Sequence, residues 1–389
     1  MSEYMYLYIY KVTIKYEILG FEVSYRLKRI IFSIEIYVCI KIITPKKEVH
    51  PMSVNTEMQD TIEAMVQKGK GIIAIDESFP TIAKRFNPIH VESTEENRRY
   101  WRSLVLSTPG LGDFISGAIL FEETLTQKND AGMTLPDVAD ENGIVAGIKV
   151  DKGTISLDNA DGDKVTEGLD GLAERLKVYK TQGARFAKWR EVYPVSTSNP
   201  TPLGVEVNAE VLARYAAICQ SVGIIPIVEP EVLIDGEHSI ERSFEVVEAV
   251  QHAVYHALHR HKVILEYTIL KPSMVTSGKE STDKASPEDI ANYTVKVLRR
   301  TVPAAVPSIN FLSGGQTAEE ATENLNAMNA IFQSEPWELS FSYGRALQQP
   351  ALNTWGGKRE NYKITQKALL KRARLNGAAR NGTYKFSME

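Results

Sequence analysis

A lysine lies at the end of an apolar run in TILKPSMV, where Lys271 directly precedes a proline. A buried ammonium is costly, and desolvation together with nearby cations favours the neutral amine, which can attack a carbonyl and form a Schiff base. Lys149 and Lys188 end two other apolar runs and are candidates for such cations. The plainer alternative is a lysine that reaches solvent or neutralises a carboxylate. Lys271 is therefore a candidate nucleophile.

Two carboxylates end the preceding apolar run, IVEPE. Glu229 and Glu231 are two residues apart, so an extended strand that continues through the intervening proline points both side chains to one face. Like charges placed together have separated pKa values, so one acid can hold a proton while the other stays ionised. The pair can transfer protons beside Lys271, or it can form ion pairs with Lys188 or Arg190.

Glycine-rich turns follow the last two apolar runs, in LSGGQ and SYGRA. Glycines leave backbone amides accessible and Arg345 adds a guanidinium, a combination that binds anions, although a glycine pair alone is more often only a turn. Lys84 and Arg85 follow the first run, and Arg98 and Arg99 lie in a helical stretch where solvated surface charge is the ordinary interpretation. Two separated cationic sites suit a bisphosphate.

Eight short apolar runs recur from residue 71 onward, each followed by a stretch long enough for a helix. They end at polar residues separated by 27 to 46 positions, which are Asp76, Glu122, Lys149, Lys188, Glu229, Lys271, Ser313 and Arg345. Near-continuous apolar strands indicate a parallel sheet covered by helices. Eight units predict an α/β fold, a (β/α)8 TIM barrel with a parallel eight-stranded core, whose chemistry lies at the carboxyl ends of the strands. A doubly wound open sheet is the competitor, but no G-x-G-x-x-G follows the first run.

The composition is that of an ordinary globular protein. The 389 residues are 43% apolar and 24% charged with a formal net charge of −4, which argues against disorder and against a general affinity for nucleic acid or anionic membrane. Cys39 and Cys219 are the two cysteines, too few for a disulfide framework, and they favour a reducing compartment. We therefore expect a cytoplasmic protein.

Residues 1–51 differ in composition from the rest of the chain. The first fifty residues hold seven of the 17 tyrosines, and they carry eight Lys and Arg against five acids. Their apolar run, 30–43, is interrupted by charges and is shorter than the roughly 20 residues that span a membrane. Early glutamates argue against a secretory signal, and few serines with five glutamates disfavour a plastid transit peptide. We expect an atypical extension outside the core, or translation from Met52, and a barrel domain over residues 52–389.

A row of histidines in QHAVYHALHRH has the spacing of metal ligands on a helix. The four are His252, His256, His259 and His261. The predicted helix runs back from the fifth strand to the start of the sixth, which places its C-terminal end at the face of the barrel opposite the chemistry. We therefore predict no metal site here.

Seven motifs in order, IAIDES, GIKVDKG, FAKWR, PIVEPE, LKPSMV, FLSGGQ and SYGRAL, closely resemble those of the Schiff-base, metal-independent (class I) fructose-bisphosphate aldolases. The resemblance covers about residues 53–384. It implies reversible cleavage of fructose 1,6-bisphosphate to dihydroxyacetone phosphate and glyceraldehyde 3-phosphate in glycolysis and gluconeogenesis. It also implies no metal or other cofactor, a small sugar phosphate as the partner rather than nucleic acid or membrane, and a homotetramer.

The resemblance also implies roles for individual residues. Lys271 would form the Schiff base, Glu229 would shuttle protons with Glu231 and Lys188 tuning it, and Asp76 would take the C4 hydroxyl proton. Ser313, Gly314, Gly344 and Arg345 would hold the C1 phosphate, and Gly315 and Ser342 join them as binding candidates. Thr81, Lys84, Arg85 and Lys149 would serve the C6 end, and Arg98 and Arg190 are further substrate-binding candidates.

Two departures from the family pattern affect details. Phe79 and Pro80 stand where smaller or polar residues are expected beside the phosphate-binding turn, which the proline would stiffen. The ending GTYKFSME lacks the longer family tail with its terminal tyrosine, so slower protonation of the enamine is expected. The alternatives are a Schiff-base enzyme for another sugar phosphate, a catalytically idle binding scaffold, and a metal-dependent aldolase that uses the histidine row.

Overall fold

The computed structural model describes residues 54–389, and the expectations for residues 1–51 lie outside this part of the chain. The barrel strands are β1 (Gly71–Ile75), β2 (Ile115–Leu120), β3 (Val145–Lys149), β6 (Phe186–Tyr193), β7 (Ile225–Val232), β8 (Ile269–Leu270), β9 (Ser308–Phe311) and β10 (Glu338–Tyr343). The helices are α3 (Val54–Met65), α4 (Phe79–Phe86), α5 (Glu95–Leu106), α6 (Leu135–Glu141), α7 (Leu172–Thr181), α8 (Pro202–Ser221), α9 (Ile240–Arg260), α10 (Pro287–Thr301), α11 (Ala318–Ile331), α12 (Arg345–Trp355) and α13 (Tyr362–Arg380). Six 3-10 turns complete the described part: η1 (Asn87–Ile89), η2 (Leu111–Asp113), η3 (Glu122–Leu125), η4 (Leu265–Tyr267), η5 (Arg359–Asn361) and η6 (Phe386–Met388).

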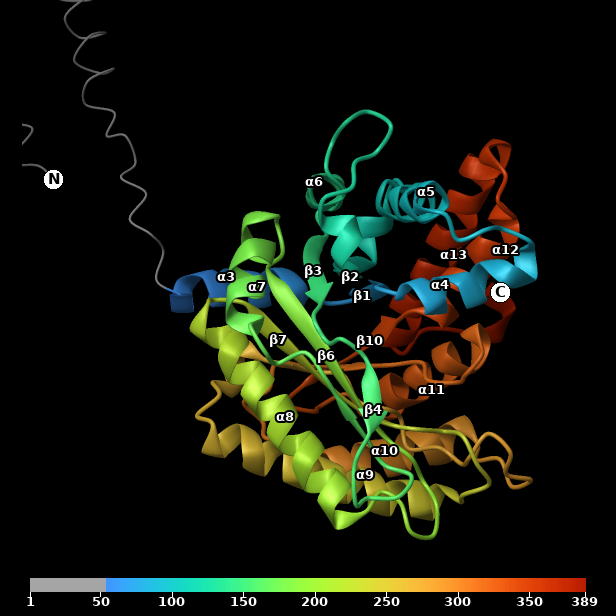
Figure 1. Ribbon diagram of the computed structural model, residues 1–389. Coiled ribbons are helices and arrows are strands. Elements are labelled where there is room, and N and C mark those ends of the chain that lie inside the picture. The colour runs from blue at the N-terminus through green and yellow to red at the C-terminus, as the bar shows by residue number, and fades with distance from the viewer. Residues whose placement is uncertain (1–53) are drawn as a thin grey trace, which may run out of the picture. The chain divides into compact units, whose positions relative to one another are not determined.

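The eight barrel strands form a closed parallel sheet in the order β1-β10-β9-β8-β7-β6-β3-β2. The first and last strands close the ring by pairing Ile72 with Ser342 and Ile73 with Tyr343. Helices surround the strands (Figure 1). The prediction of a (β/α)8 barrel is therefore confirmed, because each apolar run supplies one strand and each following segment returns the chain along the outside.

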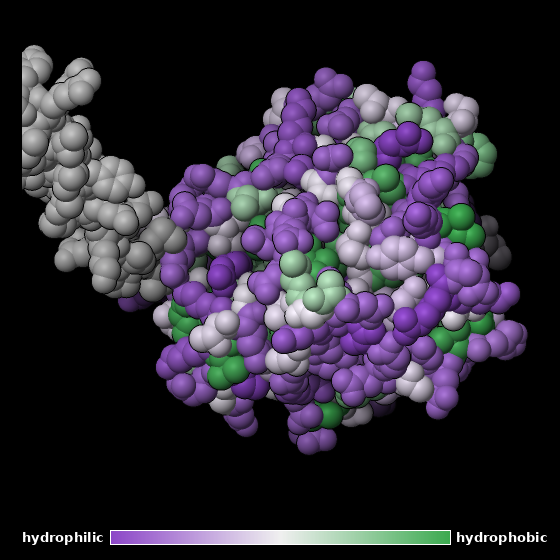
Figure 2. Space-filling model, turned by 90° about the horizontal axis from the view of Figure 1, so that it is seen from above, coloured by the Kyte–Doolittle hydropathy of each residue, from purple (hydrophilic) through white to green (hydrophobic). Residues whose placement is uncertain are grey.

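The inside of the barrel is filled by apolar side chains that point inward from alternate strand positions. Ile72, Ile119 and Ile227 belong to this inner cluster, together with Met58 and Met65 of α3. α3 thus closes the amino-terminal end of the barrel, while the carboxyl ends of the strands remain lined by polar groups. The surface in Figure 2 is mostly hydrophilic over the described residues, with hydrophobic side chains in small separate groups.

The expected sixth strand is shorter than its apolar run indicates. Only Ile269–Leu270 are in β8, and the preceding Leu265–Tyr267 form the 3-10 turn η4. The side chain of Gln220 takes the place of a strand neighbour here, because it accepts a hydrogen bond from the Ile264 amide at 2.9 Å and donates to the Ile264 carbonyl at 2.8 Å. Apolar content alone did not reveal this competing partner.

A small antiparallel hairpin, β4 (Thr154–Ser156) and β5 (Lys164–Thr166), follows β3 and was not predicted. Its strands have three residues each and are largely exposed, so they lack the apolar alternation that marks a strand in sequence. Among the helices of residues 54–389, none combines the length and the apolar content needed to cross a bilayer.

Candidate active site

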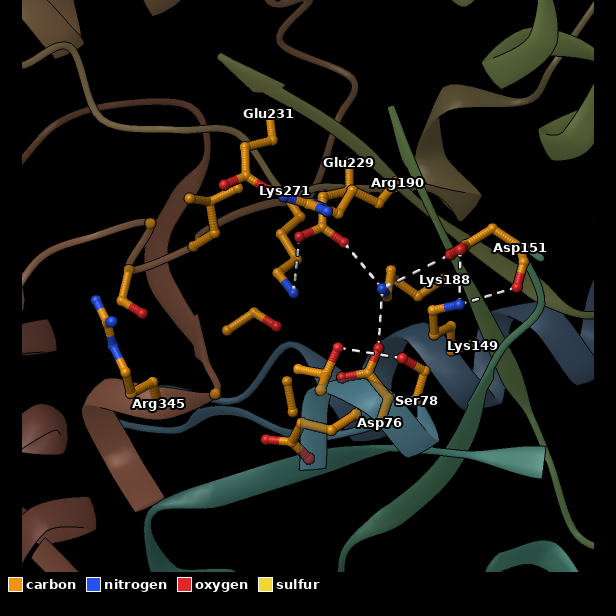
Figure 3. Close-up of a pocket in the computed structure, with 18 of the residues that line it drawn as sticks. Asp76, Ser78, Lys149, Asp151, Lys188, Arg190, Glu229, Glu231, Lys271 and Arg345 are labelled. Atoms are coloured by element: carbon orange, nitrogen blue, oxygen red, sulfur yellow. Dashed lines mark hydrogen bonds and ion pairs between the residues drawn. The ribbon is translucent and has the colours of Figure 1, made fainter. Parts of the chain in front are cut away.

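A cavity of ≈790 Å³ opens at the carboxyl ends of the barrel strands. Its lining includes residues that lie in or just after β1, β3, β6, β7, β8, β9 and β10, so segments far apart in sequence meet at one mouth. Figure 3 shows Lys271 near the centre of the cavity, with Arg345 to one side and Lys149 and Asp151 to the other. Seven of the eight predicted polar strand ends line this cavity. The exception is Glu122, which instead accepts hydrogen bonds from Lys152 and Tyr179.

Lys271 follows β8 and is 4% exposed. Its backbone amide donates to the carbonyl of Val228 at 2.8 Å, which continues the pairing of β8 with β7 and holds the lysine against that strand. Its Nζ lies 3.1 Å from Oε1 of Glu229. An amine and a carboxylate at this distance can exchange a proton directly.

The ammonium of Lys188 is surrounded by three carboxylates (Figure 3). Nζ lies 2.8 Å from Asp76, 3.3 Å from Glu229 and 3.8 Å from Asp151. Lys188 is 4% exposed, so these charges interact with little screening by water. One buried cation on β6 therefore interacts with acids on β7, just after β1 and after β3.

The ionisation of these groups follows from their packing. Burial acts to raise the pKa of Asp76, but the charges of Lys188 and then Lys271 outweigh it and lower the pKa to about 2. Burial acts to lower the pKa of Lys188, and Asp76, Glu229 and Asp151 together raise it well above its usual range. Asp76 is thus a carboxylate and Lys188 an ammonium at neutral pH, so Asp76 can accept a proton.

Glu231 lies in the same strand as Glu229, because β7 continues through the proline between them. Its Oε2 accepts a hydrogen bond from Nε of Arg190 on β6. Glu229 instead faces Lys271 and Lys188. Both glutamates therefore form ion pairs, as one alternative predicted, and Glu229 is also placed beside the candidate nucleophile.

One end of the cavity is built from the turns after β9 and β10. Ser313, Gly314, Ser342, Gly344 and Arg345 all line it. Gly314 has φ of +55°, a left-handed conformation that glycine adopts without strain, and Gly344 is the N-cap of α12. Backbone amides at the start of a helix, together with a guanidinium, form a site for an anion.

The opposite end is built from α4 and the segment after β3. Thr81, Lys84, Arg85 and Lys149 line it. Nζ of Lys149 lies 2.6 Å from Oδ1 of Asp151. Arg85 Nε is 3.1 Å from Oε1 of Glu77. Arg345 lies on one side of Lys271 and Lys149 on the other, so the cavity has a cationic group on each side of this lysine (Figure 3).

Two of the predicted binding residues do not line the cavity. The guanidinium of Arg98 donates hydrogen bonds to Glu123 at 2.7 and 2.9 Å. Its Cζ lies 4.5 Å from the centre of the Phe79 ring. Gly315 packs against Ile234, whose Cδ1 would be 2.3 Å from an added Cβ. Gly314, the neighbour of Gly315, lines the cavity, whereas Arg98 lies in α5 and pairs with Glu123 outside it.

The departures at Phe79 and Pro80 have a local explanation. Pro80 lies in the first turn of α4, where a helix does not use the amide hydrogen that proline lacks. Phe79 is 49% exposed and packs edge-on against Phe121 at 5.2 Å between ring centres. The proline therefore fits the turn, as the sequence indicated.

Sequence reasoning missed several residues of the cavity wall. Asp151 is 7% exposed and pairs with Lys149 and Lys188, and Lys152, Gly153 and Thr154 extend the wall beside it. The signal was the VDKG that follows β3, which places an acid just beyond the marker lysine. Ion pairing between strand ends could have suggested it, but which acid meets which lysine depends on the barrel.

The histidine row of α9 is outside the cavity. Nε2 of His261 lies 2.6 Å from Oε1 of Glu210 on α8, and His252, His256 and His259 are exposed. Within residues 54–389, no three His, Cys, Asp or Glu side chains gather in a geometry that could hold a metal ion.

Comparison with known proteins places this architecture in a family. The family model for fructose-bisphosphate aldolase class-I matches residues 57–389. The chain is 56% identical over 317 residues to cytosolic fructose-bisphosphate aldolase 4 of Arabidopsis thaliana, covering 82% of this chain and 81% of that protein. It is 52% identical over 343 residues to a Plasmodium falciparum fructose-bisphosphate aldolase, covering 88% of this chain and 92% of that protein.

A solved structure of the Plasmodium falciparum aldolase, in complex with TRAP and a small-molecule inhibitor, superposes with a TM-score of 0.84. The alignment covers 86% of this chain and 97% of that one at 52% identity. Sequence, fold and cavity agree, and the chain belongs to the class-I fructose-bisphosphate aldolase family.

Proposed function

We propose that this aldolase cleaves fructose 1,6-bisphosphate through a Schiff base on Lys271. The family activity is a glycolytic carbon–carbon lyase reaction that acts on a sugar phosphate. The observation that carries the assignment is a buried lysine 3.1 Å from Glu229, between two cationic ends of one cavity. Ser313, Gly314, Gly344 and Arg345 would bind the C1 phosphate, and Thr81, Lys84, Arg85 and Lys149 the C6 phosphate.

The first steps form the iminium. Glu229 takes a proton from the ammonium of Lys271, and the free amine adds to the C2 carbonyl of the substrate to give a carbinolamine. Glu229 then returns a proton to the C2 hydroxyl, which leaves as water, and the nitrogen lone pair forms the C=N bond. Lys188 and the Arg190–Glu231 pair hold Glu229 in place through charge.

The cleavage step uses Asp76. Its carboxylate, ionised because the pKa is about 2, takes the C4 hydroxyl proton. The C4–O electrons form the new aldehyde, the C3–C4 bond breaks, and its electron pair moves into the C2 iminium to give a neutral enamine. Glyceraldehyde 3-phosphate leaves. Protonation of the enamine at C3 and hydrolysis of the imine release dihydroxyacetone phosphate and regenerate the amine.

The test is borohydride reduction in the presence of dihydroxyacetone phosphate, followed by intact-mass measurement and peptide mapping. We expect one adduct on Lys271 in the wild type, none in Lys271→Met, and retention of the adduct in Lys188→Met, which loses a neighbouring ammonium but keeps the nucleophile. No adduct together with turnover abolished by a chelator would replace the mechanism with metal catalysis. Neither adduct nor turnover would indicate a binding scaffold.

The location, assembly and boundaries are parts of the same proposal. A cytosolic location is supported by the relatives named cytosolic in Arabidopsis thaliana and cytoplasmic in Spinacia oleracea. A homotetramer is proposed from the family resemblance, and light scattering at the monomer mass of 43.5 kDa would refute it. Peptide mapping of the N-terminus tests whether residues 1–51 accompany the barrel domain 52–389.

A further inference from the structure

Glu191 is a carboxylic acid with no exposed surface, outside the catalytic set. It lies in β6, whose side chains alternate between two faces. Lys188 and Arg190 face the cavity, whereas Trp189 packs against Tyr215 of α8 at 5.5 Å between ring centres. Glu191 is on the same outer side as Trp189. A buried acid is costly unless its oxygens receive hydrogen bonds, so its presence calls for a structural partner.

Both oxygens of Glu191 accept hydrogen bonds. Oε1 accepts from Nε1 of Trp189 at 2.8 Å, and Oε2 accepts from the backbone amide of Thr166 at 3.1 Å. The hydroxyl of Thr166 in turn donates to the carbonyl of Arg190 at 2.8 Å. Thr166 is therefore attached to β6 by two bonds, one of them to a carboxyl group.

Thr166 belongs to β5, the second strand of the hairpin beside β6 (Figure 1). Its partner is Thr154 in β4, and the pairing continues beyond the strands, where Lys152 donates to Glu167 at 2.8 Å and Glu167 donates to Gly153 at 2.9 Å. Lys152, Gly153 and Thr154 line the cavity. The hydrogen bond between Thr166 and Glu191 therefore restrains this part of the cavity wall through the β4–β5 hairpin.

We propose that Glu191 is a positioning residue that, through Thr166, holds residues 149–154 at the C6-phosphate end of the cavity. This inference rests on the proposed function, in which Lys149 serves that phosphate. Asp151 lies in this segment and holds Nζ of Lys149 at 2.6 Å. Displacement of the hairpin therefore moves the lysine that would meet the C6 phosphate, and leaves the turns at the C1 end in place.

The charge of Glu191 strengthens this control. Burial raises its pKa, the bonds from Trp189 and Thr166 lower it, and the nearby charge of Asp151 raises it, with a net value of about 7. The other titratable group that faces it is the phenol of Tyr193, whose pKa is raised by burial and by Glu191 itself. Protonation removes the charge that strengthens both N–H···O bonds, so the attachment weakens below neutral pH.

The test compares fructose 1,6-bisphosphate with fructose 1-phosphate, which lacks the C6 phosphate. In Glu191→Gln the amide NH₂ opposes one N–H donor, and we expect KM for the bisphosphate to rise about tenfold, the change that loss of a charge-assisted hydrogen bond produces. KM for fructose 1-phosphate and kcat should remain within about twofold. Glu167→Gln is the matched control, because this exposed glutamate lies next to Thr166 in the hairpin.

Thr166→Val removes the bond to the Arg190 carbonyl and should shift the KM ratio of the two substrates in the same direction, which keeps the test available if Glu191→Gln does not fold. Below pH 7 the KM ratio should rise more steeply in wild type than in Glu191→Gln, where only protonation of the C6 phosphate of the substrate changes it. Equal KM changes for both substrates, or variants that match Glu167→Gln, would overturn the proposal.

Hydrogen exchange separates this proposal from the proposed function. We expect faster amide exchange over residues 152–166 in Glu191→Gln whether or not the protein turns over. An unchanged exchange rate there would overturn the positioning role. A wild type that forms no borohydride adduct, but whose Glu191→Gln variant exchanges faster, would remove the catalytic assignment and keep the attachment of the hairpin.

Discussion

Removal of the Lys188 charge should destabilise the protein in a pH-dependent manner. The methionine of Lys188→Met has nearly the same length, so the main change is the loss of the cation that lies 2.8, 3.3 and 3.8 Å from Asp76, Glu229 and Asp151. All three acids are buried or nearly so. Their burial is then less well compensated, although Lys271, Lys149 and Arg190 remain near them.

The magnitude follows from Asp76. Lowering its pKa from 3.8 to about 2 corresponds to roughly 2 kcal/mol of net stabilisation at neutral pH. The variant loses this term and also leaves the burial cost of the acids uncompensated, so a decrease in unfolding free energy of about 4 kcal/mol is expected at pH 7. In the wild type, the Asp76 contribution is complete above pH 3.8 and is lost as pH falls towards 2.

In Lys188→Met the pKa of Asp76 should shift in the opposite direction. Without Lys188, burial dominates and raises the pKa of Asp76 above its usual range, so the native state takes up protons before the unfolded state as pH falls. The gap between the two proteins should therefore be largest at pH 7 and should narrow by pH 5. Urea denaturation at both pH values measures it.

Lys177→Met is the matched control. It removes the same charge from an exposed pair with Glu174 at 2.7 Å, where a loss of at most about 0.5 kcal/mol is expected. The double variant Lys188→Met/Asp76→Asn should be more stable than Lys188→Met alone. A Lys188→Met protein that is no less stable than Lys177→Met, or a gap that does not change with pH, would refute the reasoning.

Three further predictions concern other parts of the molecule. The pKa of Glu191 is about 7 in the folded protein, against 4.5 for an ordinary glutamate, so its ionisation lowers the free energy of unfolding as pH rises from 4.5 to 7. The unfolding free energy of Glu191→Gln relative to wild type should therefore increase by about 3 kcal/mol between pH 4.5 and 8. A difference that does not change with pH in urea denaturation would contradict this. Arg345→Gln should raise KM at least roughly tenfold for both fructose 1,6-bisphosphate and fructose 1-phosphate, since both carry the C1 phosphate, whereas exposed Arg374→Gln on α13 should not; a rise confined to the bisphosphate would place Arg345 at the other end. Dialysis against a chelator should leave turnover unchanged, and activity restored only by added metal would exclude the Schiff-base route.

Much of the fold could be predicted from local patterns of apolar and polar residues. Eight apolar runs with polar ends predict eight parallel strands, because strand burial depends on the residues of the run itself. The pair at Glu229 and Glu231 could be assigned to one face from their spacing alone, since side chains alternate along a strand. The short β8 was the exception, because the side chain of Gln220, 44 residues away, binds the backbone that would have extended it.

The ion-pair partner of each charged side chain could not be predicted from local sequence patterns. Lys188 meets Asp76, Glu229 and Asp151 only because the ring closes and brings four strand ends together. Likewise, Arg98 does not line the cavity, because its guanidinium pairs with Glu123. The buried acid at Glu191 is likewise explained only by a hairpin that the sequence did not indicate.

The sequence by itself thus determined the number and direction of the strands, the candidate nucleophile and the residue types at each end of the cavity. The tertiary structure decided which carboxylate faces which ammonium, and with that the ionisation of Asp76 and Lys188. The physical reason is that the two properties depend on residues at different separations along the chain. Apolar periodicity is a property of adjacent residues, whereas the energy of a buried charge depends on every group within a few ångströms, whatever its place in the chain.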